Sequence, residues 1–435
     1  MACSVLGLLC CGGMCCPSCA AQGQETGLRM PRSCEELQRF GQPWMRELLR
    51  RSGYPHTLQS MTAVESSSGG LSSSSVMLSL VFESETGTET RDVFVKLVPL
   101  KKSSRVLTQL LRMHVLEYMF YTQIAAKVQG EILLPKLVVG DCSLTSGLYI
   151  LAIEKLACRM PKMYEPGNPQ QLSAADVRAC LTCLATWHAR FWGDVHVTRN
   201  DLGFALKDNG FARKLIAREA KRRWPKFVKL MNQHLPGRLT PVMHRLYHLA
   251  VQRDTIRQNR SLGWTVLCHG DAHCENFFLQ ESGGQVCAGV LDFQSLAVRD
   301  LAVDVSWFWV SSIPAPVAKD HDQVLVQHYF DVLSAKLAEF GEGSPPGQVL
   351  ELREQIAVYV PAVLLRLVLA VGGGLVDLGT QQEKGMWQFD RLDAAIEIFQ
   401  VSEVFERYVT GQTLAQKRVA AASPKPVGSR RVAPI

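Results

Sequence analysis

The 435-residue sequence contains neither a GxxxxGKS nor a GxxxxGKT phosphate loop, which excludes a nucleotide site of the P-loop type. It has no basic residue before Arg29, which argues against a secretory signal peptide. Its best candidate for a membrane span, residues 356–376, is interrupted by Pro361, Arg366 and three successive glycines. A buried helix explains this stretch better than a span does. We therefore expect a soluble protein, unless its N-terminus is lipidated.

Aromatic residues are few and positive charge is unevenly distributed. The formal net charge is +7, and 8% of the residues are aromatic. Residues 207–229 hold nine basic and two acidic side chains, and residues 411–435 hold five basic and no acidic ones. Such a basic face could attract phosphate, an anionic small molecule or a membrane surface, although a solvated helix face is the more ordinary explanation. With so little aromatic interleaving, nucleic acid is not an expected partner.

Cysteine is frequent but has no metal-binding or disulfide spacing. Six of the fourteen cysteines lie within the first nineteen residues, and the others are scattered. A chain of this size folds without disulfides, so we expect thiols and a cytoplasmic location. The N-terminal cysteines could be palmitoylated, which would give peripheral membrane contact; a disordered leader is the alternative. Cys180 and Cys183 lie in an apolar helical pattern, where core packing is the expected role.

The segment 268–279, CHGDAHCENFFL, followed by VLDF at 290–293, carries the strongest functional signal. Its polar residues lie between apolar stretches, and Ser282-Gly283-Gly284 predicts a hairpin that brings Asn276 and Asp292 together. Their oxygen atoms suit Mg²⁺. The spacing H-x-D-x-x-x-x-N predicts a phosphoryl-transfer site in which Asp271 is the catalytic base and Asn276 and Asp292 are metal ligands. The alternative is a surface loop of turns and caps.

Two upstream residues complete this predicted site. Lys96 lies on a predicted strand, 92–98, and Glu117 lies in an apolar helical stretch, 107–128. A lysine on such a strand can hold the α- and β-phosphates of a nucleotide when a carboxylate fixes its ammonium group. We therefore expect Lys96 to pair with Glu117. The Ser/Gly-rich segment 66–75 could fold over the phosphates, but an ordinary linker has the same composition.

These motifs resemble those of the ecdysteroid-kinase-like and CHK-kinase-like proteins, within the aminoglycoside and choline phosphotransferase superfamily. The likeness extends over about residues 31 to 405 and includes a Gln directly after Asp-Phe, where protein kinases carry Gly. The segments that carry it are HGDAHCEN at 269–276, LDFQ at 291–294, RDLAVDVSWF at 299–308, FVKLVP at 94–99, the helix with Glu117 and Tyr121, and LATWHARFW at 184–192.

The resemblance implies an α+β, protein-kinase-like fold with two lobes. The length of the chain agrees with two lobes, because 435 residues exceed the usual size of a domain with one hydrophobic core. The expected order is a small antiparallel-sheet lobe and then a larger, mainly helical lobe. The expected segments are a Cys-rich leader (1–28), an N-terminal nucleotide lobe (29–155), a C-terminal catalytic and acceptor lobe (156–410) and a basic, disordered tail (411–435). Glu154 would lie at the lobe connector, whose backbone binds adenine; Lys155 replaces the Asp usual there.

The resemblance further implies transfer of the γ-phosphoryl group of Mg–ATP to a hydroxyl group of a small acceptor, sterol-like or choline-like. A protein acceptor is disfavoured because no A-P-E signature follows LDFQ. The alternatives are a catalytically silent nucleotide-binding regulator and a membrane-attached interaction protein. We expect His269 to order the loop and His188 to pack in the core, and we assign no role to His273. Asp300 and Asp304 are expected either to brace the loop or to cap a helix.

Overall fold

The computed structural model describes residues 26–66, 74–84, 87–99, 112–143, 148–164, 172–193, 206–207, 210–252 and 264–410. The predicted leader up to residue 25, the tail from residue 411 and most of the Ser/Gly-rich segment 66–75 lie outside the described residues. The predictions of lipidation, of a disordered tail and of a phosphate-covering loop therefore stay predictions.

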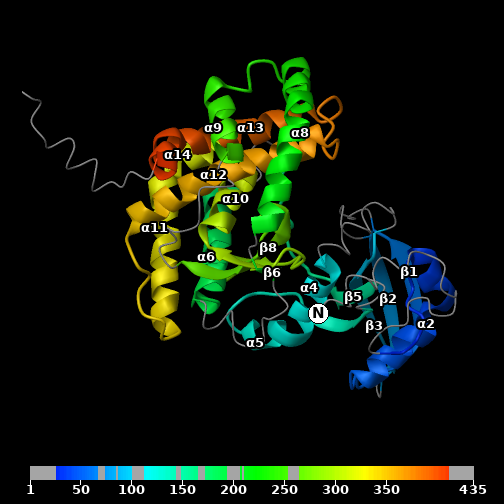
Figure 1. The fold of residues 1–435 in the computed structure, drawn as a ribbon. Helices are drawn as coiled ribbons and strands as arrows, with labels where there is room; N and C mark the ends of the chain where they lie inside the picture. The colour runs from blue at the N-terminus through cyan, green and yellow to red at the C-terminus, as the bar shows by residue number, and fades with distance from the viewer. Residues whose placement is uncertain are drawn as a thin grey trace, which may run out of the picture.

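The N-terminal part is built on a five-stranded antiparallel sheet with strand order β1-β2-β3-β5-β4 (Figure 1). Its strands are β1 (Thr57–Glu65), β2 (Ser74–Ser84), β3 (Gly87–Leu97), β4 (Leu137–Cys142) and β5 (Tyr149–Glu154). Helix α2 (Cys34–Arg51) packs on β1, and the Ser33 hydroxyl caps its N-terminus by accepting the N–H of Glu36. The predicted small antiparallel lobe is confirmed.

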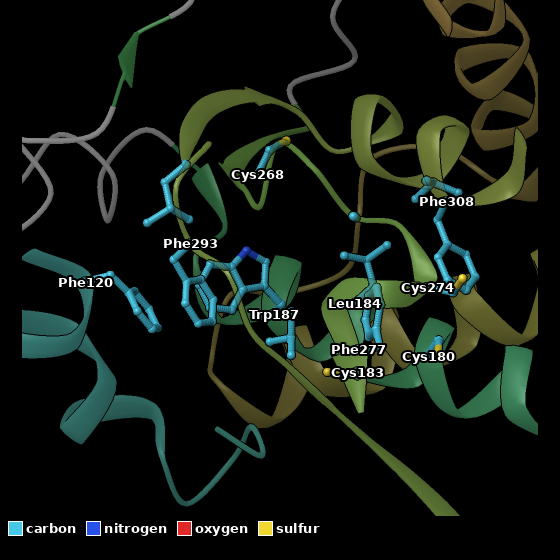
Figure 2. Packing of buried hydrophobic residues seen from close by; sticks show 14 of the residues in the cluster. Phe120, Cys180, Cys183, Leu184, Trp187, Cys268, Cys274, Phe277, Phe293 and Phe308 are labelled. Atoms are coloured by element: carbon cyan, nitrogen blue, oxygen red, sulfur yellow. The ribbon is translucent and has the colours of Figure 1, made fainter. Parts of the chain in front are cut away.

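Between β3 and β4 the chain forms a helix with an irregular centre. Helix α4 (Met113–Met119) leads into a π-helix, η2 (Phe120–Ile124), and then α5 (Ala125–Val128). The sequence predicts a helical stretch from residue 107. Residues 107–111 lie outside the described part, and α4 begins at Met113. Phe120 stacks on Phe293 at 3.7 Å between ring centroids, and Phe293 stacks on Trp187 (Figure 2). These aromatic contacts hold the helix against the segment that carries Asp292.

The C-terminal part is mainly helical, as predicted (Figure 1). Short strands hold the predicted catalytic segment within it, and the predicted hairpin turn at 282–284 joins β8 to β9. The helices are α6 (Ala174–Arg190), α8 (Gly210–His234), α9 (Pro241–Gln252), α10 (Ala302–Ser312), α11 (Ala315–Glu339), α12 (Val349–Gly372), α13 (Gln382–Ile398) and α14 (Val401–Thr410). The strands are β6 (Leu206–Lys207), β7 (Thr265–Cys268), β8 (Phe277–Ser282), β9 (Gln285–Val290) and β10 (Ala297–Asp300).

Helix α12 corresponds to the apolar stretch at 356–376. Within the part of the chain that the structure describes, it alone has the length and apolar composition of a membrane span, and 61% of its most apolar window is buried inside the protein. It packs against α8 and α10 and includes Pro361. The expectation of a core helix is confirmed, and the helix ends at the predicted glycines.

Helix α10 braces the segment before Asp271 through the carboxylate of Asp304. Its Oδ2 accepts the backbone N–H of His269 at 2.6 Å, and its Oδ1 accepts that of Gly270 at 2.9 Å. His188 bonds through Nε2 to Asp304 Oδ2 at 3.2 Å and through Nδ1 to the Tyr329 hydroxyl at 2.6 Å. Asp304 thus braces the loop, and His188 combines its predicted core position with a hydrogen-bonding role.

Asp300 caps a helix, which is the second of the two roles expected for Asp300 and Asp304. Its Oδ1 accepts the N–H of Ala302 at 2.9 Å, which caps the start of α10. Asp300 is only 7% exposed, and Oδ2 has no hydrogen-bond partner among the described residues. Burial outweighs the Ala302 hydrogen bond and raises the pKa of Asp300 to about 6. The folded protein therefore holds this proton at pH values where the unfolded chain has released it.

Asp300→Asn keeps the acceptor for Ala302 and removes the buried charge. Because the folded pKa lies above the unfolded one, the carboxylate costs stability progressively as the pH rises through the folded pKa. We expect the substitution to increase the free energy of unfolding, by about 2 kcal/mol more at pH 7.5 than at pH 4.5. Urea unfolding at both pH values measures this, and an equal effect at the two values would contradict it.

Candidate active site

Three segments that are distant in the sequence meet at the Lys96 ammonium group. Lys96 lies on β3, and its Nζ is 2.7 Å from Glu117 Oε1 and 2.8 Å from Asp292 Oδ1. The side chains of Lys96 and Glu117 are 8% and 0% exposed, whereas that of Asp292 is 28% exposed. The expected contact between Lys96 and Glu117 is present. Asp292 faces solvent more than the other two, so the cluster opens on its side.

The two carboxylates outweigh the cost of burying the ammonium group. Burial alone lowers the pKa of Lys96, but the charges of Asp292 and Glu117 and the hydrogen bonds to them raise it above its usual value. Lys96 is therefore charged throughout the physiological range. Burial raises the pKa of Glu117, against the opposing effects of Lys96 and Gln294. Two carboxyl groups share one ammonium group, and the partly exposed Asp292 is the one that a further cation could reach.

Gln294 fixes the second oxygen of Glu117. Its Nε2 donates to Glu117 Oε2 at 3.2 Å, and both side chains are buried. Each Glu117 oxygen thus has a donor, one from β3 and one from the residue two positions after Asp292. Gln is typical of the resembled family at this position, and no motif gives the Gln294 side chain a role. A polar residue directly after Asp-Phe, where protein kinases carry Gly, is the signal that could have suggested one.

The segment around Asp271 is held at several backbone and side-chain atoms. The Asn276 Nδ2 donates to the backbone oxygen of Asp271 at 2.8 Å, which leaves the Asn276 Oδ1 as the atom that could bind a metal. The Leu291 N–H donates to the Asn276 backbone oxygen at 3.0 Å, and His269 Nε2 bonds to Leu291 O at 3.0 Å. The predicted hairpin thus brings Asn276 to Leu291, the residue directly before Asp292, while a shared metal site of Asn276 and Asp292 stays a prediction. His269 orders the loop as expected.

Glycine is required at position 270. Its φ is +82°, and a Cβ atom there would lie 2.0 Å from the backbone oxygen of Ser295. Asp292 also has a positive φ, +70°, which costs energy for a residue other than glycine. Such strain persists only where surrounding contacts fix it, and here Asp292 is bonded to Lys96. The backbone on both sides of the site is therefore closely determined.

The Asp271 carboxylate is half-exposed and ionised. Its Oδ1 accepts the Trp307 indole N–H at 3.0 Å, and its Oδ2 lies 3.6 Å from His273 Nε2. Loss of solvent raises the pKa of Asp271, but the interaction with His273 and the charges of His273 and Arg366 outweigh this and lower it to about 2. Asp271 can accept hydrogen bonds at neutral pH, but it is a weak base.

The Glu154 side chain is bonded at the end of β5, away from the Lys96 cluster and from the Asp271 loop. Its carboxylate accepts the Lys136 N–H at 2.9 Å, and its own N–H donates to Lys136 O at 2.9 Å. These bonds close the end of β5 against the residue before β4. β5 ends at Glu154, as the strand pattern predicts, whereas its place at a lobe connector that binds adenine remains a prediction.

The cysteines of the described core are packing residues. Cys180 and Cys183 are buried in α6, and burial raises the pKa of Cys183 to about 12 and that of Cys180 well above its usual value. His188, Cys268 and Asp304 have potential ligand atoms within 4.8 Å of one another. Burial also raises the pKa of the Cys268 thiol. His188 Nε2 bonds to Asp304 at 3.2 Å, and the Cys268 thiol donates to the backbone oxygen of Asp300 at 3.3 Å, so all three side chains have hydrogen-bond partners within the protein.

Gln294→Met tests whether the bond to Glu117 stabilises the cluster. Methionine has a similar volume but no donor, so Glu117 Oε2 would be left buried and unsatisfied. We expect the free energy of unfolding to fall by about 1–3 kcal/mol. Gln280→Met, on β8, is the control, because it makes the same chemical change at a glutamine that does not bond to Glu117. Urea unfolding of both variants measures the effect, and equal stabilities would show that the Gln294 contact contributes little.

Three solved structures are similar to this chain at low identity. They are a choline/ethanolamine kinase family protein from Mesorhizobium loti (15% identity, TM-score 0.42, covering 86% of this chain and 98% of that one), an ethanolamine kinase from Plasmodium vivax (11%, 0.45, 86% and 97%) and an amicoumacin kinase in complex with AMP-PNP and Ca²⁺ (13%, 0.42, 83% and 96%). A search of curated proteins gives no match.

The sequence also matches a family model, that of the ecdysteroid kinase-like family, over residues 72–342. This range is more than half of the chain and includes Lys96, Glu117, Asp271, Asn276 and Asp292. The match agrees with the resemblance found in the motifs and with the observed order of a five-stranded antiparallel sheet and a helical lobe, the protein-kinase-like arrangement. The chain belongs to the ecdysteroid kinase-like family.

Proposed function

We propose that the protein is an ATP-dependent small-molecule kinase that transfers the γ-phosphoryl group of ATP to a hydroxyl group. The observation that carries this proposal is the convergence of Lys96 on Glu117 and Asp292 at 2.7 and 2.8 Å. A buried lysine fixed by a helix carboxylate, next to an Asp-Phe motif and an H-x-D-x-x-x-x-N loop, is the arrangement used for phosphoryl transfer. Family membership supports the same reaction class.

Lys96 would bind the nucleotide phosphates, and Glu117 would keep its ammonium group in place. Because Lys96 is bonded to Asp292, we expect phosphate oxygens to replace Asp292 as its partner when the nucleotide binds. Asp292, partly exposed, and the Oδ1 of Asn276 would then be free to hold Mg²⁺; oxygen ligands fit this ion. When bound, the ion would neutralise charge on the phosphate oxygens during transfer.

Asp271 would orient the acceptor hydroxyl and receive its proton. One of its oxygens accepts the Trp307 N–H, so the other is the one available to the acceptor. A pKa of about 2 makes Asp271 a weak base. That is compatible with phosphoryl transfer, whose loose transition state needs little nucleophile activation and depends mostly on position and charge.

The acceptor that we propose is a small alcohol, sterol-like or choline-like, and not a protein. A cytoplasmic location and acylation of the N-terminal cysteines also remain proposals. Vesicle binding that is lost on removal of residues 1–28 would support the membrane-attached alternative.

A phosphorylation screen with labelled Mg–ATP over hydroxylated sterols and small alcohols tests the proposal. We expect the wild type to phosphorylate at least one acceptor, and Asp292→Asn and Asp271→Ala to lose about 10²-fold or more of that activity while both variants still fold cooperatively. Asp320→Asn, at an exposed position on α11, is a matched control.

Two results would overturn parts of this proposal. Full activity of purified Asp271→Ala protein would exclude Asp271 as the base. Wild-type protein that binds Mg–ATP but phosphorylates none of the hydroxyl compounds would favour the catalytically silent regulator.

A further inference from the structure

The same helix that braces the backbone before Asp271 also contacts its side chain. Trp307 follows Asp304 by three positions on α10, so both lie on one face of the helix. Asp304 accepts the N–H groups of His269 and Gly270, and the Trp307 Nε1 donates to Asp271 Oδ1 at 3.0 Å. One helix therefore fixes both the backbone and the carboxylate of the loop. No motif in the sequence indicates a role for Trp307 by itself.

Arg366 holds the Trp307 ring in turn. It lies on α12, and its guanidinium carbon is 4.5 Å from the centroid of the Trp307 ring. The Arg366 Nη2 also donates to the backbone oxygen of Gly270 at 3.3 Å. One guanidinium group thus contacts the indole that bonds to Asp271 and the carbonyl that directly precedes Asp271. Guanidinium groups stack favourably on indole rings, so the contact limits rotation of Trp307.

The two carboxylate oxygens of Asp271 consequently differ in their hydrogen-bond partners. Oδ1 accepts the indole N–H, which fixes the rotation of the carboxylate about its Cβ–Cγ bond. Oδ2 lies 3.6 Å from His273 Nε2, beyond a normal hydrogen bond, and the carboxylate is 41% exposed. Oδ2 is therefore the oxygen that can receive a proton from an acceptor. A carboxylate free to rotate would present either oxygen and would spend less time in the productive orientation.

We propose that Trp307 is a positioning residue of the transfer reaction, which orients the Asp271 carboxylate through its indole N–H, and that Arg366 supports it. This inference rests on the proposed function, because the orientation matters only if Asp271 receives a proton. Trp307 acts through Asp271 and not on the phosphates. Its loss should therefore reduce turnover and leave nucleotide binding unchanged.

Trp307→Phe keeps an aromatic ring for Arg366 and removes the N–H donor. We expect kcat to fall by about 10- to 100-fold, with the KM values for ATP and for the acceptor changed by less than about twofold. Arg366→Met should lower kcat in the same way but by a smaller factor. A KM for the acceptor that rises at constant kcat would show that Trp307 binds the acceptor instead, and would overturn the inference.

Trp309→Phe is the matched control. Trp309 lies two positions further along α10, packs edge-on against Phe399 at 5.0 Å between ring centroids, and its Nε1 has no hydrogen-bond partner among the described residues. The substitution makes the same chemical change on the same helix without touching Asp271. We expect its kcat, per folded molecule, to equal that of the wild type. An equal loss in Trp309→Phe and Trp307→Phe would point to a general effect on α10 and would contradict the inference.

A double-mutant cycle in urea unfolding tests the contact without any assay of activity. The cycle combines Trp307→Phe with Asp271→Ala, and we expect the unfolding equilibrium constant to show a coupling of about tenfold. Additive effects would overturn the contact. Failure of the proposed function has a different signature: the wild type would phosphorylate no acceptor while the coupling is still present. Failure of this inference alone would show as an active wild type and a fully active Trp307→Phe variant.

Discussion

The ion cluster of Lys96, Glu117 and Asp292 is the constraint on which the site depends. Glu117 is fully buried, so its charge is tolerated only because Lys96 and Gln294 bond to its two oxygens. Lys96 is in turn shared with Asp292, which lies 196 positions away in the sequence. The Lys96 ammonium group thereby links β3, helix α4 and the segment after the β8–β9 hairpin. The stacking of Phe120 on Phe293 holds the same helical segment against the segment of Asp292.

Around this cluster, rigidity comes from backbone groups bonded to buried side chains. Asp304 accepts two successive N–H groups of the loop, His188 and Tyr329 support Asp304, and the close approach to Ser295 admits only glycine at position 270. Phosphoryl transfer depends chiefly on placing charges and reacting groups, so a loop held at this many atoms suits the reaction that we propose. Helix α10 combines these supports with the Trp307 contact to Asp271.

The sequence predicted the parts of the site that have local signals. The spacing of HGDAHCEN and LDF, with turn residues between two apolar strands, was enough to place Asn276 near the strand that leads to Asp292, and order along the chain was enough to pair Lys96 with Glu117. The polar residue after Asp-Phe could indicate that Gln294 has a role but not which residue it contacts. The contacts of Trp307 and Arg366 could not be predicted, because each joins segments whose relative packing no local pattern encodes. The π-helix after α4 could not be predicted either, because five residues are too few to show a hydrophobic periodicity of their own. The bonds between Glu154 and Lys136 depend on the register of β4 and β5, which the sequence does not specify.

The most direct measurement of the central claim uses the unmodified protein. An ATP analogue with a reactive acyl phosphate transfers its acyl group to a lysine that lies beside the bound phosphates, and mass spectrometry identifies that lysine. Lys96 should be acylated despite its burial, and excess Mg–ATP should suppress the reaction, whereas the exposed Lys319 on α11 should react weakly and to the same extent with and without ATP. Labelling of surface lysines alone, with Lys96 unmodified or indifferent to ATP, would contradict a nucleotide site at this cluster.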